Sequence, residues 1–194
     1  MDRAWLRYAQ TLTYCDPRSY LVRLRELEIE IAQSDLPERV KHLRTNELKT
    51  MRETREAAIF CHGMGQRIGQ TVYFSSNESQ DYDFIASWSF KGNRHFVPVQ
   101  LKEVVPVNVN ASATFSDVVA SLGKYVDSKN LIVAVHLNQQ THFDPSSFVV
   151  PQLRIAALWV FASIAPDQSV WGLWGNLIEE QTGTSFDYPV QALI

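Results

Sequence analysis

The chain has 194 residues, a formal net charge of −3 and 20% charged residues, which is ordinary for a globular protein and unlike a basic nucleic-acid coat. Its apolar runs fall short of the roughly 18 residues that span a bilayer. Its first residues lack the pattern of an export signal. Only two cysteines occur, Cys15 and Cys61, without CxxC spacing. We therefore expect reduced thiols in a cytoplasmic protein that is not bound to a membrane.

The first 50 residues predict a helical extension. Apolar residues recur there at helical spacing, with charged residues between them: Leu21, Leu24, Leu27 and Ile31. Pro37 is predicted to open a second helical segment, and Gly69 is among the glycines expected to weaken or end it. The apolar stripe suggests a homodimer contact through these helices. The basic residues of this region are interleaved with glutamates, so a solvated face or such a contact is as consistent with them as phosphate binding.

From about residue 70 the apolar period changes to two, which predicts strands. The turn between the second and third strands is expected at residues 91–93. A helix follows, with Thr114 and Asp117 resembling a capping box, and then an apolar run typical of a strand buried on both faces. Two further strands are predicted at the C-terminus. The expected order is a helix, three strands, a helix and a strand, which gives an α/β domain. After the first helix, the expected strands are 71–75, 83–90 and 95–107, the helix is 113–128 and the last strand is 130–137.

The third predicted strand, "FVPVQLK", has one apolar and one partly polar face. Residues two apart in a strand share a face, so the core face consists of Val97, Val99 and Leu101. Gln100 and Lys102 then lie on the opposite face, across the hairpin from Asp83. A buried ammonium without partners is costly. An acid, an amide oxygen and an ammonium that converge there would suit a hard divalent cation and an activated water.

This pattern resembles the PD-(D/E)xK nuclease superfamily, which includes restriction endonucleases and Holliday-junction resolvases. Asp83 is followed by Gln100-x-Lys102, a helix bearing Glu56 precedes them, and a helix and a hydrophobic strand come after. The similarity covers roughly residues 50–140. It implies a restriction-endonuclease-like α-β-β-β-α-β core with a mixed sheet in residues 51–194, and leaves residues 1–50 as the N-terminal helical extension.

The resemblance also implies a role for each site residue. Asp83 would be the central metal-binding carboxylate, Gln100 would occupy the place of the second acid, and the backbone carbonyl of Leu101 would be a further ligand. Lys102 would position the attacking water and stabilise charge on the phosphate. Glu56 would support the metal from the helix. The implied reaction is Mg²⁺- or Mn²⁺-dependent hydrolysis of phosphodiester bonds in DNA.

Other interpretations of the same residues remain open. Gln100 is neutral, so the site has one negative charge fewer than usual, and the chain is alternatively a catalytically inactive module that binds nucleic acid or a protein partner. Asp83 and Lys102 could form only a structural ion pair. Asp81 competes with Asp83 for the metal role, and Glu53 competes with Glu56.

The aromatic and histidine residues of the C-terminal half favour packing over chemistry. Trp171 and Trp174 are more typical of a core or an interface than of base stacking. His136 stands in an apolar strand, where a hydrogen-bonded core histidine is a more common finding than a ligand.

Overall fold

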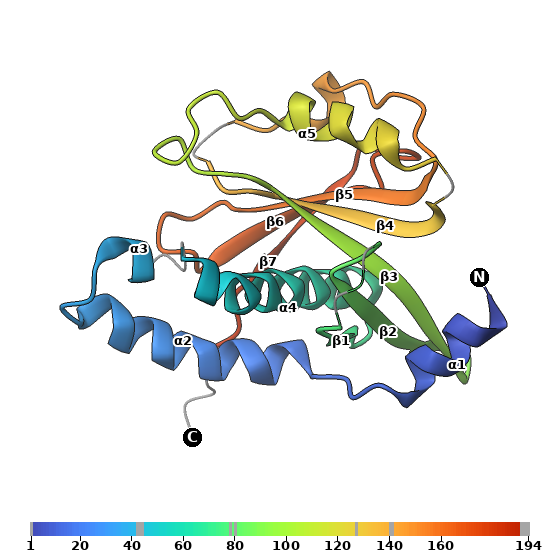
Figure 1. The fold of residues 1–194 in the computed structure, drawn as a ribbon, viewed down its shortest axis with the longest axis horizontal. Coiled ribbons are helices and arrows are strands. Elements are labelled where there is room, and N and C mark those ends of the chain that lie inside the picture. The colour runs from blue at the N-terminus through green and yellow to red at the C-terminus, as the bar shows by residue number, and fades with distance from the viewer. Residues whose placement is uncertain are drawn as a thin grey trace.

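A computed structural model describes residues 2–41, 45–77, 79, 81–126, 128–139 and 142–190, which form an α/β fold around one seven-stranded mixed sheet (Figure 1). The strands are β1 (Tyr73–Ser75), β2 (Phe84–Phe90), β3 (Asn93–Val104), β4 (Ser128–Leu137), β5 (Ile155–Ser163), β6 (Val170–Trp174) and β7 (Gly183–Asp187). The α-helices are α1 (Arg3–Thr11), α2 (Pro17–Gln33), α3 (Glu38–Lys41), α4 (Lys49–Ile68) and α5 (Phe115–Ser121). Short 3-10 turns occupy Asn46–Leu48, Leu122–Lys124 and Pro145–Ser147.

The strands lie in the sheet in the order in which they occur in the sequence. β1, β2 and β3 form an antiparallel meander, and β3, β4 and β5 are parallel neighbours. β6 and β7 then add antiparallel strands to the far edge. The helix–three strands–helix–strand order predicted from the sequence is present as α4, β1, β2, β3, α5 and β4.

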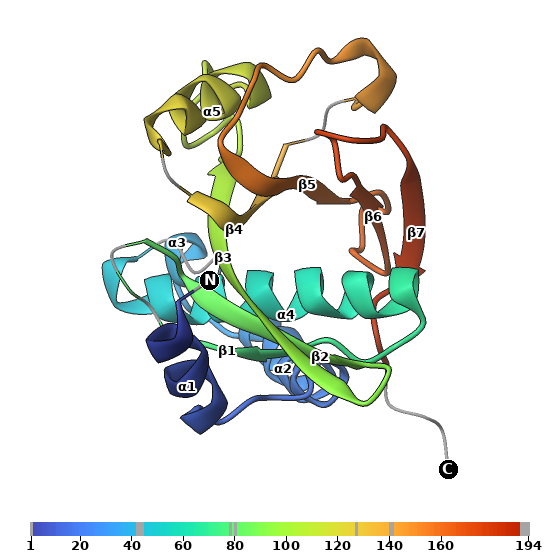
Figure 2. The same cartoon turned by 90° about the vertical axis from the view of Figure 1, so that its right-hand side faces the viewer.

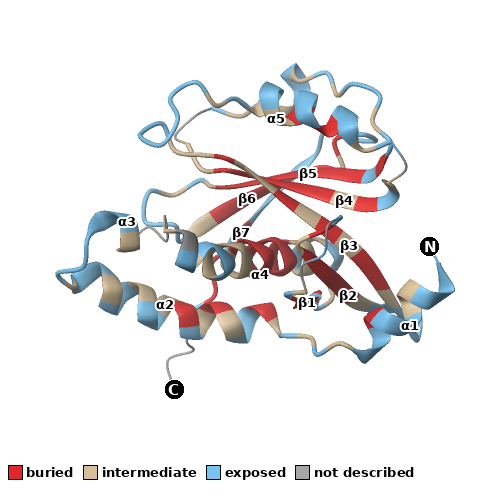
Figure 3. Cartoon of the chain, in the orientation of Figure 1, coloured by how far each residue is buried: buried red, intermediate tan, exposed pale blue. Residues whose placement is uncertain are grey.

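The sheet curves around α4, with α2 packed on the outer side of that helix and α5 on the opposite face of the sheet (Figure 2). Buried residues run along α4 and the central strands (Figure 3). The predicted inner face of β3 is confirmed, because Val97, Val99 and Leu101 belong to the core that includes Ala57 and Phe60 of α4. The other face of the sheet buries a second apolar cluster against α5. The strand β3 is therefore covered on both sides.

The β2–β3 hairpin is built as the sequence predicted. Its turn residues Lys91 and Gly92 have φ angles of 50° and 77°, which is the left-handed region that two-residue hairpin turns require. The pairing places Phe84 opposite Val99. Thr114 also caps α5 as expected, with its hydroxyl oxygen accepting from the Asp117 N–H at 3.1 Å.

Gly69 ends α4 in the left-handed conformation, in agreement with the sequence. Two features differ from the sequence predictions. The segment after Pro37 contains only the short α3 before residues 42–44, which lie outside the described residues, and the long helix α4 begins at Lys49. At the C-terminus a third added strand, β7, was missed because Phe186 is its single buried residue.

The N-terminal helices pack onto the same core as the sheet. Leu21 of α2 is fully buried in the α4-side core, and Ala9 of α1 is buried in the cluster on the other face. Leu24 is also buried, so much of the stripe that suggested a homodimer points into the chain. The homodimer stays a prediction. Within the described ranges, the helices are too short or too polar to cross a bilayer.

Candidate functional site

Asp83 lies where β2 begins and separates from β3. Its main-chain N–H donates to the carbonyl of Val99 at 3.0 Å, and its carboxylate Oδ2 accepts from the Leu101 N–H at 2.6 Å. The carboxylate thus satisfies a β3 backbone donor at the point where β2 supplies no further carbonyl. This contact fixes Asp83 Oδ2 beside the Leu101 peptide.

Gln100 joins the same group through its side-chain amide. Its Nε2 donates to Asp83 Oδ2 and also lies 3.3 Å from the Leu101 carbonyl oxygen. Asp83 and the Leu101 carbonyl are two of the four metal ligands that the resemblance implied, with Gln100 and Glu56 as the others. The amide N–H group therefore lies between two oxygen acceptors.

Lys102 shares the strand face of Gln100 and is half-buried. Burial lowers the pKa of its ammonium group, and the nearby Lys124 lowers it further, while Asp83 and Glu53 act in the opposite direction. Asp83 also contributes to raising the pKa of Tyr125, after the larger effect of burial. These couplings place Lys102 and Tyr125 in the electrostatic field of the Asp83 carboxylate.

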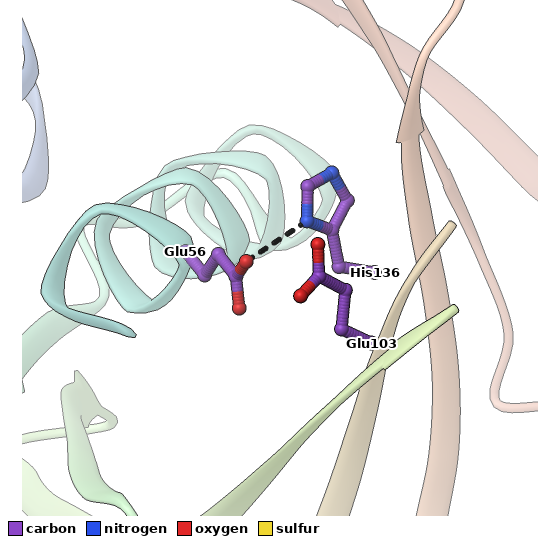
Figure 4. Close-up of side chains that lie close together, drawn as sticks. All are labelled: Glu56, Glu103 and His136. Atoms are coloured by element: carbon purple, nitrogen blue, oxygen red, sulfur yellow. Dashed lines mark hydrogen bonds and ion pairs between the residues drawn. The ribbon is translucent and has the colours of Figure 1, made fainter. Parts of the chain in front are cut away.

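Glu56 lies in a second group, formed with Glu103 and His136 (Figure 4). Glu56 comes from α4, Glu103 from β3 and His136 from β4, and the last two are direct partners in the parallel β3–β4 ladder. The His136 Nδ1 is 3.1 Å from Glu56 Oε1. One ligand atom from each residue lies within 4.8 Å of the others, an arrangement that could hold a metal ion.

The surroundings of this second group fix its side chains. The His136 ring stacks on Phe161 with ring centres 5.0 Å apart, and Asn138 Nδ2 donates to Glu103 Oε1 at 2.8 Å. Arg52 Nε lies 4.0 Å from Glu103 Oε2. The side chains of Glu56 and His136 are only 5% and 6% exposed. Two acids and an imidazole are thus held together in the interior with their partners in place.

The two groups face different recesses. Glu56 and His136 line a cleft of about 800 Å³ between α2, α4 and the loops that follow β3 and β5. Asp83 lines a smaller recess of about 40 Å³ that also includes Glu53 of α4. The structure therefore brings Asp83, Gln100 and Leu101 into contact, keeps Lys102 within electrostatic range of Asp83, and places Glu56 in the other cleft. Of the two helix acids considered from the sequence, Glu53 is the one beside Asp83.

Glu103 was not singled out from the sequence, and His136 was favoured as a core residue. One pattern could have identified Glu103, because it continues the core face of β3 two residues after Leu101 and is therefore an acid on an otherwise apolar face. His136 is indeed buried. Trp171 is a core residue as expected, being 1% exposed.

No family model, curated protein or solved structure matches this chain significantly. The chemistry of both groups therefore has to follow from their own residues and contacts.

Proposed function

We propose that the protein is a metal-dependent nuclease that hydrolyses phosphodiester bonds in DNA, with a restriction-endonuclease-like core and a reaction centre at Asp83, Gln100 and Lys102. The observation that carries the proposal is the convergence of the Asp83 carboxylate, the Gln100 amide and the Leu101 carbonyl at the start of β2. The mixed sheet, with α4 on one face and α5 on the other, supports the core assignment.

The donor set fits a hard divalent cation. Asp83 supplies a carboxylate oxygen and Leu101 a carbonyl oxygen, both beside the Gln100 amide. Rotating that amide by half a turn exchanges its nitrogen for its oxygen and brings a third oxygen to the same place. Oxygen ligands of this kind are those that Mg²⁺ and Mn²⁺ accept. A bound Mg²⁺ would supply positive charge to the phosphate and acidify its water ligands.

The protein's own contribution is then orientation and charge. Lys102 points from the same strand face as Gln100, so its ammonium group can hold the attacking water and neutralise charge on the phosphate oxygens. Burial and Lys124 lower the pKa of Lys102, and Asp83 and Glu53 oppose that shift. The neutral Gln100 leaves the site one negative charge short of two carboxylates, which predicts weak Mg²⁺ affinity.

The test is a cleavage assay on supercoiled plasmid and single-stranded DNA with Mg²⁺ or Mn²⁺. Lys102→Ala should lower the cleavage rate by roughly 10²–10⁴-fold, the usual contribution of a positioned proton-transfer or charge-stabilising group. Lys129→Ala is the matched control, because Lys129 is an exposed lysine on the adjacent strand β4. Equal cleavage by wild type and Lys102→Ala would refute the proposed site.

A second candidate function is an inactive module of the same fold that binds nucleic acid or a protein. Its support is the closed hydrogen bonding of Asp83, whose Oδ2 already accepts from Leu101 and Gln100. Gln100→Glu separates the two functions. A nuclease should gain Mg²⁺ affinity and rate from the restored carboxylate, whereas an inactive module should show no cleavage with either residue.

A further inference from the structure

We propose that Glu56, Glu103 and His136 form a second metal site, separate from the Asp83 group and selective for a divalent transition-metal ion, with Zn²⁺ as the preferred ion. The three residues come from α4, β3 and β4 and point toward one another (Figure 4). No part of the proposed nuclease mechanism uses Glu103 or His136.

The spacing of the donors fits a small ion. Ligand atoms about 2.0–2.2 Å from a tetrahedral Zn²⁺ are roughly 3.3–3.6 Å apart. Glu56 Oε1 and His136 Nδ1 are already 3.1 Å apart, and the Glu103 donor lies within 4.8 Å of both. An adjustment of the Glu103 side chain by about 1 Å would complete the geometry. Such a change is within the reach of a side chain that is still 13% exposed.

Charge also favours a dication at this place. Two carboxylates in a nearly closed interior repel each other, because the effective dielectric constant there is far below that of water. Arg52, at 4.0 Å from Glu103, offsets part of the negative charge. A divalent ion between Glu56 and Glu103 would offset both carboxylates at once.

The donor types select the kind of ion. Imidazole suits zinc and other first-row transition metals, whereas Mg²⁺ and Ca²⁺ prefer oxygen donors alone. Supporting contacts of the outer shell are present: Asn138 donates to Glu103, and Phe161 fixes the plane of the His136 ring. Three protein donors leave coordination positions for water or a bound ligand, and the 800 Å³ cleft that Glu56 and His136 line gives access to them.

Isothermal titration of the chelator-treated full chain with Zn²⁺ alone, and in parallel with Mg²⁺ alone, tests the site. We expect one Zn²⁺ per chain, and weaker Mg²⁺ binding at this group. His136→Asn and Glu103→Gln should each weaken Zn²⁺ binding by at least about 10–100-fold, the loss seen when only an outer-shell partner is removed. His95→Asn is the matched control, since His95 lies at the far end of β3 beside Trp88.

Asp83→Ala separates this site from the proposed nuclease centre. The variant should lose nuclease activity and keep Zn²⁺ binding, so either proposal can fail without the other. Circular dichroism checks whether each variant is folded. If His136→Asn is unfolded, Glu103→Gln alone provides the test. Zn²⁺ binding that is absent from wild type, or unchanged in both folded variants, would overturn the second site.

Discussion

The Asp83 group and the Glu56 group share strand β3 but are held together by different parts of the chain. Asp83 is bound by the main chain of Leu101 and the neighbouring Gln100 amide, all within one hairpin. Glu56 and its partners use side chains from a helix and two strands, and they are almost fully buried. The Asp83 group can therefore change its hydrogen-bond partners with little effect on the core, whereas the Glu56 group is part of the core.

The largest stability effect should come from removing Glu56. Glu56→Ala leaves the buried His136 without its 3.1 Å partner, and an unsatisfied buried polar group costs about 1–3 kcal/mol, or more if it is charged. Denaturant unfolding measures the free energy of unfolding directly. Glu30→Ala, on the exposed side of α2, is the control. If the free energy of unfolding fell by less than about 1 kcal/mol, the Glu56 group would contribute no more to the core than the Asp83 group does.

A smaller effect is expected at Asp83. Asp83→Ala removes the acceptor of the Leu101 N–H, which should cost about 1–2 kcal/mol. Asp83→Asn keeps an oxygen acceptor there and should recover most of that stability, while remaining inactive if the carboxylate is needed for metal. Thermal unfolding and the cleavage assay on the same two variants check this. Equal destabilisation by Ala and Asn would show that the carboxylate's charge, rather than its oxygen, supports the hairpin.

The smallest effect concerns His62, a second buried histidine, which lies on α4 and contacts the Phe186 ring. Burial lowers the pKa of His62, and a hydrogen bond with the Asp187 backbone opposes this shift. In the unfolded chain His62 therefore takes up a proton near pH 6.5, whereas in the folded chain it does so only at a lower pH. Stability conferred by the neutral ring should be full above pH 6.5 and decline as the pH falls below it.

His62→Gln removes that titration and retains a donor. Unfolding free energies measured from pH 7.5 to 5 should decline less steeply in the variant than in wild type. Parallel declines would assign the pH dependence to other groups and leave His62 without a part in it.

Local patterns in the sequence predicted the hairpin, the two faces of β3, the α5 cap and the approach of Gln100 to Asp83. These depend on alternation, turn residues and capping over short spans. The Glu56–His136 contact joins residues that are 80 positions apart in the sequence. No local pattern predicts which turn of a helix packs against which strand, so this contact could not be predicted. The sequence did not predict strand β7 for a related reason, because one buried residue among five gives no apolar alternation.

Helix α2 is bonded to segments from the C-terminal part of the sequence. The Tyr188 hydroxyl donates to the Leu21 carbonyl at 3.3 Å, and Arg25 donates to the Asp167 carbonyl at 2.8 Å. During synthesis α2 is made before these partners, which follow Leu21 and Arg25 by 167 and 142 residues. Because contacts distant in sequence form late and slow folding, α2 can pack on α4 early but gains these two hydrogen bonds only after the C-terminal strands have formed.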